Sequence, residues 1–165
     1  MTFRWGALTV VLALDLGTHT GWAMWDGAHT ESGVQVFDLK RGESPGMRFV
    51  RFNRWLSSWV AGGHWPALVA YEQTHHRGGA APEVAAGFAT LVQEFCAPND
   101  IEHTAVHSAT LKRWPPGKGN ADKRAVLAAV AQRWKAVEDD NEADAIALLH
   151  YALGELVSPV MAGWR

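Results

Sequence analysis

The sequence predicts an α/β fold, a single domain in which a five-stranded mixed sheet carries helices on both faces. Five short apolar or alternating runs are bounded by Gly, Thr, Asp or Pro, as β-strands are. Longer segments with apolar residues at helical spacing lie between and after these runs. With 165 residues, 48% of them hydrophobic, the chain is long enough for one well-cored domain, expected over residues 1–165, and too short for two large lobes.

The first three strands are expected as hairpins, because only short turns rich in Gly, Thr and Asp separate their apolar runs. The fourth run, ALVAYE, ends in an acid, and the fifth follows a helical segment. The strands are expected at residues 8–16, 22–25, 33–39, 67–72 and 103–107.

The helices are expected where apolar residues recur every three or four positions. Phe49, Phe52 and Leu56 show this spacing in the first helix, and Gly62 and Gly63 end it. Two prolines stop the third helix, and an amphipathic pattern marks the last two. The helices are expected at residues 45–60, 82–95, 109–114, 122–135 and 140–156.

The net charge of −2 hides an uneven distribution. Residues 112–135 contain seven basic residues and one acid, a net charge of +6, and the remainder contains eight basic and 16 acidic residues, a net charge of −8. A basic segment on an acidic body is typical of a phosphate-binding surface, although a solvated helix face shows the same pattern.

The single cysteine and the short apolar runs bear on where the protein works. Cys96 has no partner for an internal disulfide and is expected to be a small buried apolar residue. A reducing cytoplasm is therefore the expected compartment. No run approaches the roughly 18 apolar residues of a membrane span, so no membrane is expected as a partner.

Carboxylates at the ends of two strand-like runs are the first sign of chemistry. Asp15 ends LALD and Glu72 ends LVAYE, so adjacent strands would bring both acids to one edge of the sheet. In the last helix Asp140, Asn141 and Asp144 are spaced to face one way. Clustered carboxylates repel unless cations lie between them, and hard divalent ions such as Mg²⁺ prefer oxygen ligands.

Four motifs, in this order, resemble the RuvC-like Holliday junction resolvases of the ribonuclease H superfamily: LALDLGTHTGWAMW, LVAYEQ, HSATLKRWPPGKGNADKRAV and NEADAIALLHYAL. The resemblance spans residues 12–153 and implies a ribonuclease H-like fold. It also implies a metal-dependent endonuclease that resolves four-way DNA junctions as a homodimer. The compact domain without helicase motifs also suits a phage-encoded enzyme.

The resemblance implies that Asp15, Glu72 and Asp144 are catalytic ligands of Mg²⁺ or Mn²⁺, with two ions in each active site. The family commonly has a fourth ligand three positions before the last aspartate, and this chain has Asn141 there. Asp140, one helical turn before Asp144, is the alternative metal ligand and catalytic residue. The sequence leaves the choice between Asp140 and Asn141 open.

Basic residues of this chain match the positions from which the family reaches the DNA backbone. Lys112 and Lys123 are the matching residues, and Lys123 is also expected to stabilise charge during cleavage. Where family members present an aromatic side chain after the fourth-strand acid, this chain has two histidines and an arginine. The expected nucleic-acid contacts are His75, Arg77, Lys112, Arg113, Lys118 and Lys123.

Several alternatives stay open. The expected partners are branched DNA and a second copy of the chain, with no small-molecule cofactor, but a nuclease of the same fold acting on RNA or on other branched DNA fits the same motifs. So does a non-catalytic junction-binding module. The motif DLGT also opens the phosphate loop of actin-like ATPases, which need two lobes. An acid can simply end a strand, and Asp139 or Asp140 can simply cap the last helix.

Overall fold

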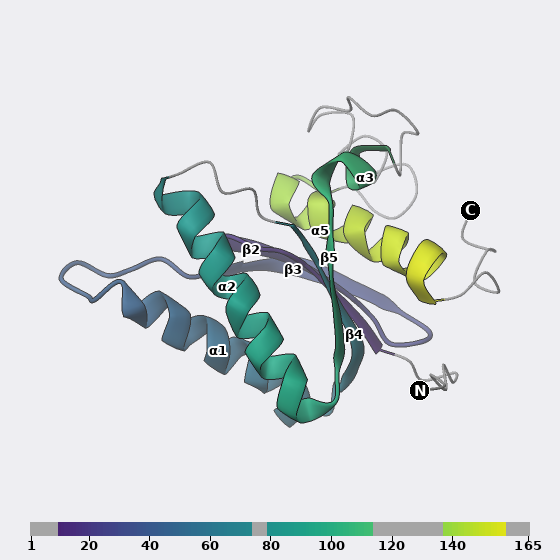
Figure 1. Cartoon of the computed structure of the whole chain (residues 1–165), viewed down its shortest axis with the longest axis horizontal. Coiled ribbons are helices and arrows are strands. Elements are labelled where there is room, and N and C mark those ends of the chain that lie inside the picture. The colour runs from purple at the N-terminus through teal and green to yellow at the C-terminus, as the bar shows by residue number, and fades with distance from the viewer. Residues whose placement is uncertain (1–9, 74–78, 114–136, 158–165) are drawn as a thin grey trace.

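The computed structural model describes residues 10–73, 79–113 and 137–157. Their five strands form one sheet in the order β3-β2-β1-β4-β5 (Figure 1). β1, β4 and β5 are parallel, and β2 is antiparallel to both of its neighbours. The strands are β1 (Val10–Asp15), β2 (His19–Trp25), β3 (Thr30–Val36), β4 (Pro66–Glu72) and β5 (Glu102–Val106). The helices are α1 (Gly46–Ala61), α2 (Ala80–Cys96), η1 (Ala97–Asn99), α3 (Ser108–Arg113), α5 (Asp140–Tyr151) and the π-helix η2 (Ala152–Val157).

Helices cover both faces of the sheet, so the predicted fold class is confirmed (Figure 1). β1 shows how a central strand serves both layers, because successive side chains point to opposite faces. Leu12 and Leu14 belong to the core shared with α1 and α2, and Val11 and Ala13 to the core shared with α5. This two-sided burial explains why β1 is almost continuously apolar up to Asp15.

Cys96 lies in the core shared with α1 and α2 and is fully buried. Burial raises the pKa of its thiol to about 12, so the side chain stays protonated and apolar, as predicted.

Some element boundaries differ from the predicted ones. β2 begins at His19, earlier than the predicted 22–25, and β3 occupies Thr30–Val36 instead of 33–39. The polar start of β3 pairs with Met24 and Trp25 of β2, so backbone pairing, not apolar pattern, sets this boundary.

The end of the chain also differs. α5 stops at Tyr151 and continues as the π-helix η2, whereas the sequence predicts an α-helix to residue 156. The predicted helix at 122–135 and the predicted strand residues 8 and 9 lie outside the described residues. Within the described part of the chain, every helix is too short or too polar to cross a membrane.

Candidate active site

The acids that end β1 and β4 lie together at one edge of the sheet. Leu14 pairs with Tyr71 in the parallel ladder, so the residues that follow them, Asp15 and Glu72, end neighbouring strands side by side. Both are partly buried and line one pocket of about 270 Å³. The other lining residues are Leu16, Gln73, Ala81, Pro82 and Ala85, the last three from the start of α2. The structure thus brings together two of the three acids expected to be primary ligands.

The two acids also share a face of the sheet. Along β1, Val11 and Ala13 belong to the α5-side core, and alternation assigns Asp15 to the same side. Along β4, Ala70 belongs to that core, and alternation assigns Glu72 to it as well. Alternation therefore directs Asp15 and Glu72 toward the α5 side at the end of the sheet, where the start of α2 also lines their pocket.

A glycine of β2 fixes the start of α5 beside Asp15. Gly21 is the ladder partner of Asp15, and cross-strand partners share a face. A Cβ atom added to Gly21 would lie 1.9 Å from the carbonyl oxygen of Asn141. Only glycine lets the helix backbone approach the strand so closely, so the first turn of α5 lies directly against the strand pair that carries Asp15.

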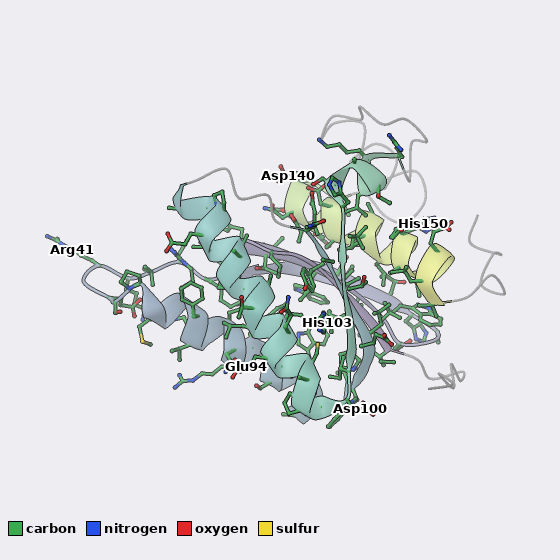
Figure 2. All side chains as sticks on the ribbon, viewed as in Figure 1. Arg41, Glu94, Asp100, His103, Asp140 and His150 are labelled. Atoms are coloured by element: carbon green, nitrogen blue, oxygen red, sulfur yellow. The ribbon has the colours of Figure 1, made fainter. Side chains whose placement is uncertain are left out.

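The first turn of α5 has a defined cap. The Asp139 carboxylate accepts hydrogen bonds from the backbone N–H groups of Asn141 (2.8 Å) and Glu142 (3.2 Å). Asp139 is therefore the N-cap, and Asp140 is the first residue of the helix, as Figure 2 shows. Of the two caps that the sequence allows, Asp139 is therefore the one used.

The remaining acid of this turn is directed elsewhere. Glu142 accepts a hydrogen bond from the Ser32 hydroxyl of β3 at 2.7 Å. Asp140, Asn141 and Asp144 are all partly buried and lie within about 100° of one another around the helix. Its contact with β3 thus sets Glu142 apart from these three residues.

The donor set at this edge suits a hard divalent cation. The pocket carries two carboxylates and the Gln73 carboxamide, all oxygen donors of the kind that Mg²⁺ and Mn²⁺ prefer. Among residues 10–73, 79–113 and 137–157, no three His, Cys, Asp or Glu side chains lie close enough together to hold a metal ion. The completion of the site by Asp144, and by Asp140 or Asn141, therefore stays a prediction.

The predicted DNA contacts are partly described. Lys112 and Arg113 are exposed on α3, directly after β5 and at the same edge of the sheet as the acids (Figure 1). Since β5 neighbours β4, they flank the strand that carries Glu72. His75, Arg77, Lys118 and Lys123 lie outside the described residues.

A second group of cations, which was not predicted from the sequence, follows β3. All seven Lys and Arg residues of the described chain follow one of the two outer strands, two of them after β5 and five after β3. The signal was visible as five basic residues within residues 40–54, but its meaning depends on where β3 ends. The five are Lys40, Arg41, Arg48, Arg51 and Arg54.

Comparison by sequence gives no match to a protein-family model and none to a curated protein. The matches by structure include two structures of RuvC of Thermus thermophilus. RuvC in complex with a Holliday junction substrate matches with a TM-score of 0.68 and 22% identity, over 85% of this chain and 90% of that chain. A second Thermus thermophilus RuvC structure matches with a TM-score of 0.63 and 21% identity, over the same shares of the two chains. The chain therefore has the fold of RuvC, which is the ribonuclease H-like fold that the resemblance of its motifs implies.

Proposed function

We propose that this protein is a metal-dependent endonuclease that resolves four-way DNA junctions by paired phosphodiester hydrolysis. The observation that carries the proposal is the pairing of Asp15 and Glu72 at the ends of neighbouring strands, in one pocket, with the acidic first turn of α5 beside them. The fold adds support, since Thermus thermophilus RuvC has been solved in complex with a Holliday junction substrate. Neither comparison bears on a phage origin.

The residues have distinct roles in this proposal. Asp15, Glu72 and Asp144 hold Mg²⁺ or Mn²⁺, two ions per site, with Asp140 or Asn141 as the fourth ligand. Bound ions of this kind supply Lewis acidity that activates water and stabilises the leaving oxygen of a phosphodiester. Asp139 orders the turn that carries the helix ligands, and Gly21 sets its distance from Asp15. Hydrolysis leaves 5′ phosphates and 3′ hydroxyls.

Cations around the acids bind the substrate backbone. Lys112 and Arg113, exposed on α3, neutralise phosphates on the β5 side of the site. Lys118, Lys123, His75 and Arg77 are proposed as further contacts, and Lys123 also stabilises charge that develops during cleavage. A homodimer follows from the reaction, because two symmetrical cuts in a two-fold symmetric junction call for two active sites.

The central test is Asp15→Asn, which keeps the shape of the side chain and removes its charge. Loss of a ligand that supports several kcal/mol of transition-state stabilisation predicts a fall in junction cleavage of about a thousandfold or more. The matched control is Asp100→Asn, an exposed position with φ 53° at the opposite end of the molecule (Figure 2), where asparagine is readily accommodated.

The measurement is the rate of cleavage of a labelled four-way junction in Mg²⁺ and in Mn²⁺. An unchanged rate in Asp15→Asn would remove this residue from the chemistry. Flapped DNA and an RNA–DNA hybrid at matched salt serve as competing substrates. Faster cleavage of either one would move the proposal to a nuclease of another substrate class, and junction binding without cleavage would indicate a binding module.

A further inference from the structure

The five cations that follow β3 form a surface, here called the basic flank, made up of Lys40, Arg41, Arg48, Arg51 and Arg54. Residues 38–54, which contain them, hold five basic residues and two acids, a net charge of +3 in a chain whose total is −2. One of the acids, Glu43, is paired with Arg51, and the other, Asp38, is exposed.

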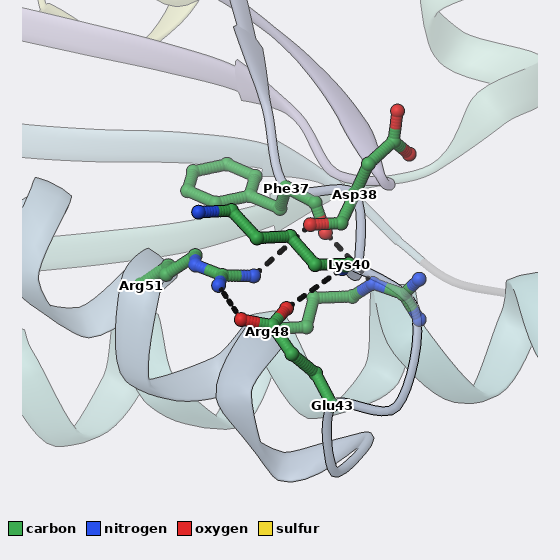
Figure 3. Close-up of polar contacts among 6 residues, drawn as sticks. All are labelled: Phe37, Asp38, Lys40, Glu43, Arg48 and Arg51. Carbon is green, nitrogen blue, oxygen red and sulfur yellow. Dashed lines mark hydrogen bonds and ion pairs between the residues drawn. The ribbon is translucent and has the colours of Figure 1, made fainter.

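The loop between β3 and α1 is held in a defined shape by its own polar contacts (Figure 3). The Glu43 carboxylate accepts hydrogen bonds from the Lys40 backbone N–H at 2.7 Å and from the Arg51 guanidinium. Arg51 also donates to the carbonyl oxygen of Asp38, and Arg48 donates to that of Phe37, both at 3.0 Å. These contacts tie the loop to α1 at both of its ends.

The basic flank thus divides into two groups. Arg48 and Arg51 are half-buried and brace the loop. Lys40, Arg41 and Arg54 are exposed, and Figure 2 shows Arg41 extending away from the body of the molecule at the tip of the loop. These contacts fix the backbone of the loop that carries Lys40 and Arg41, which lowers the backbone entropy that the loop loses on binding.

The basic flank begins at the same edge of the sheet as the proposed active site. β3 runs parallel to β1, because both are antiparallel to β2, so the two strands end on the same side. The Phe37 N–H donates to the carbonyl oxygen of Thr18 at 2.8 Å, and Thr18 lies only three residues after Asp15. Across the sheet, this edge therefore carries cations after β3, carboxylates at the ends of β1 and β4, and cations after β5.

We propose that the basic flank binds the phosphate backbone of a double-stranded DNA arm that leads away from the active site on the β3 side. The inference rests on the proposed function and assigns it a second substrate-binding surface. The exposed cations are spread out, whereas a site for one small anion needs converging donors. Lys40 and Arg41 lie in the loop before α1, and Arg54 lies eight residues after Gly46, the first residue of the helix, which is about 12 Å along its axis at 1.5 Å per residue. A distance of about 12 Å covers three to four phosphates of one strand at about 3.4 Å of helix axis each.

The test compares two double variants that change the net charge equally. Arg41→Gln with Arg54→Gln removes two exposed charges of the basic flank. Thr90→Glu with Ala97→Glu adds two negative charges at exposed positions of α2 and η1, so it lowers the net charge by the same two units. Fluorescence anisotropy in EDTA measures binding of a labelled duplex and of a labelled four-way junction at salt concentrations from about 50 to about 200 mM.

The expected result is weaker binding of both DNAs by the flank variant, by about tenfold at the low-salt end, with a slope of log K against log salt that is smaller by up to about 1.8. The control variant should keep the wild-type slope. In cleavage assays the flank variant should raise KM, because its cations act in binding.

Each other outcome counts against a named part of the proposal. If both variants weaken DNA binding equally, or if neither weakens it, the basic flank is not a DNA-binding surface. If the wild-type protein binds DNA but cuts no junction, the proposed function is overturned. The binding measurements on the two double variants still test the basic flank in that case. A wild-type protein that binds no DNA overturns both.

Discussion

The two faces of the sheet are packed with side chains of different size. Between the sheet and the α1 and α2 layer, aromatic rings fill the core: Phe52 and Phe88 stack with ring centroids 4.0 Å apart, and Phe37 meets both rings edge-on. Between the sheet and α5, alanine is the most frequent buried residue, seven of 16, beside larger Val, Leu, Ile and Trp side chains. The fully or nearly fully buried alanines of that core are Ala13, Ala23, Ala70, Ala143, Ala145, Ala147 and Ala152.

The two faces therefore have different roles, since one mainly stabilises the fold and the other positions the first turn of α5. Large rings bury much apolar area and keep the helices at a distance, so the α1 and α2 side should contribute most per residue to stability. Small residues let the backbone of α5 touch β2 at Gly21, so the α5 side fixes where the acidic first turn lies relative to Asp15. The comparison predicts that changes on the aromatic face affect folding, and that changes on the small-residue face affect catalysis as well.

Phe88→Ala should have the largest effect on stability. Phe88 is fully buried and contacts the rings of Phe37, Phe49 and Phe52. Truncation should lower the free energy of unfolding by about 3–5 kcal/mol, measured by urea denaturation, because it removes buried area and leaves a cavity. Val50→Ala, at an exposed position of α1, is the control with little expected change. A loss below about 1 kcal/mol in Phe88→Ala would contradict the assignment of this face as the main source of stability.

Gly21→Ala should cost less stability and more activity. The added methyl would overlap the Asn141 carbonyl, so α5 must shift away from β2, at a cost of about 1–3 kcal/mol. The shift moves the proposed helix ligands relative to Asp15, so junction cleavage should fall far more than the unfolding free energy alone accounts for.

Gly17→Ala is the matched control, because a Cβ there meets only the carbonyl oxygen of His19, at 3.8 Å. Junction cleavage and urea denaturation are measured on both variants. Equal activity in Gly21→Ala and Gly17→Ala would break the link between the small-residue face and catalysis.

Local pattern was enough to predict the architecture and the strand acids. Apolar runs ending in Asp15 and Glu72 predicted neighbouring strands with their acids at one edge, and the pairing of Leu14 with Tyr71 confirms this arrangement. The periodicity of residues 45–60 likewise predicted α1 to within one residue. These features depend on local sequence, which periodicity reports directly.

Features that depend on tertiary contact could not be predicted in this way. The predicted strands at 8–16 and 22–25 leave Gly21 in the turn between them, yet it lies in β2, where the backbone of α5 passes. The cations of residues 40–54 led to no prediction, because only the end of β3 places them at the same edge as the acids. In both cases the meaning of the residue depends on a partner far away in the sequence.

Asp139→Ala should have the smallest effect, because it changes only the cap of the first turn of α5. Loss of the cap leaves the N–H groups of Asn141 and Glu142 without their acceptor and should lower the free energy of unfolding by about 1 kcal/mol. Because this turn also carries Asp140, junction cleavage should fall together with stability. Asp139→Asn is the control, since its amide oxygen still accepts both hydrogen bonds and should keep most of the stability and activity. Equal losses in the two variants would show that the charge of Asp139, not its capping geometry, supports the first turn of α5.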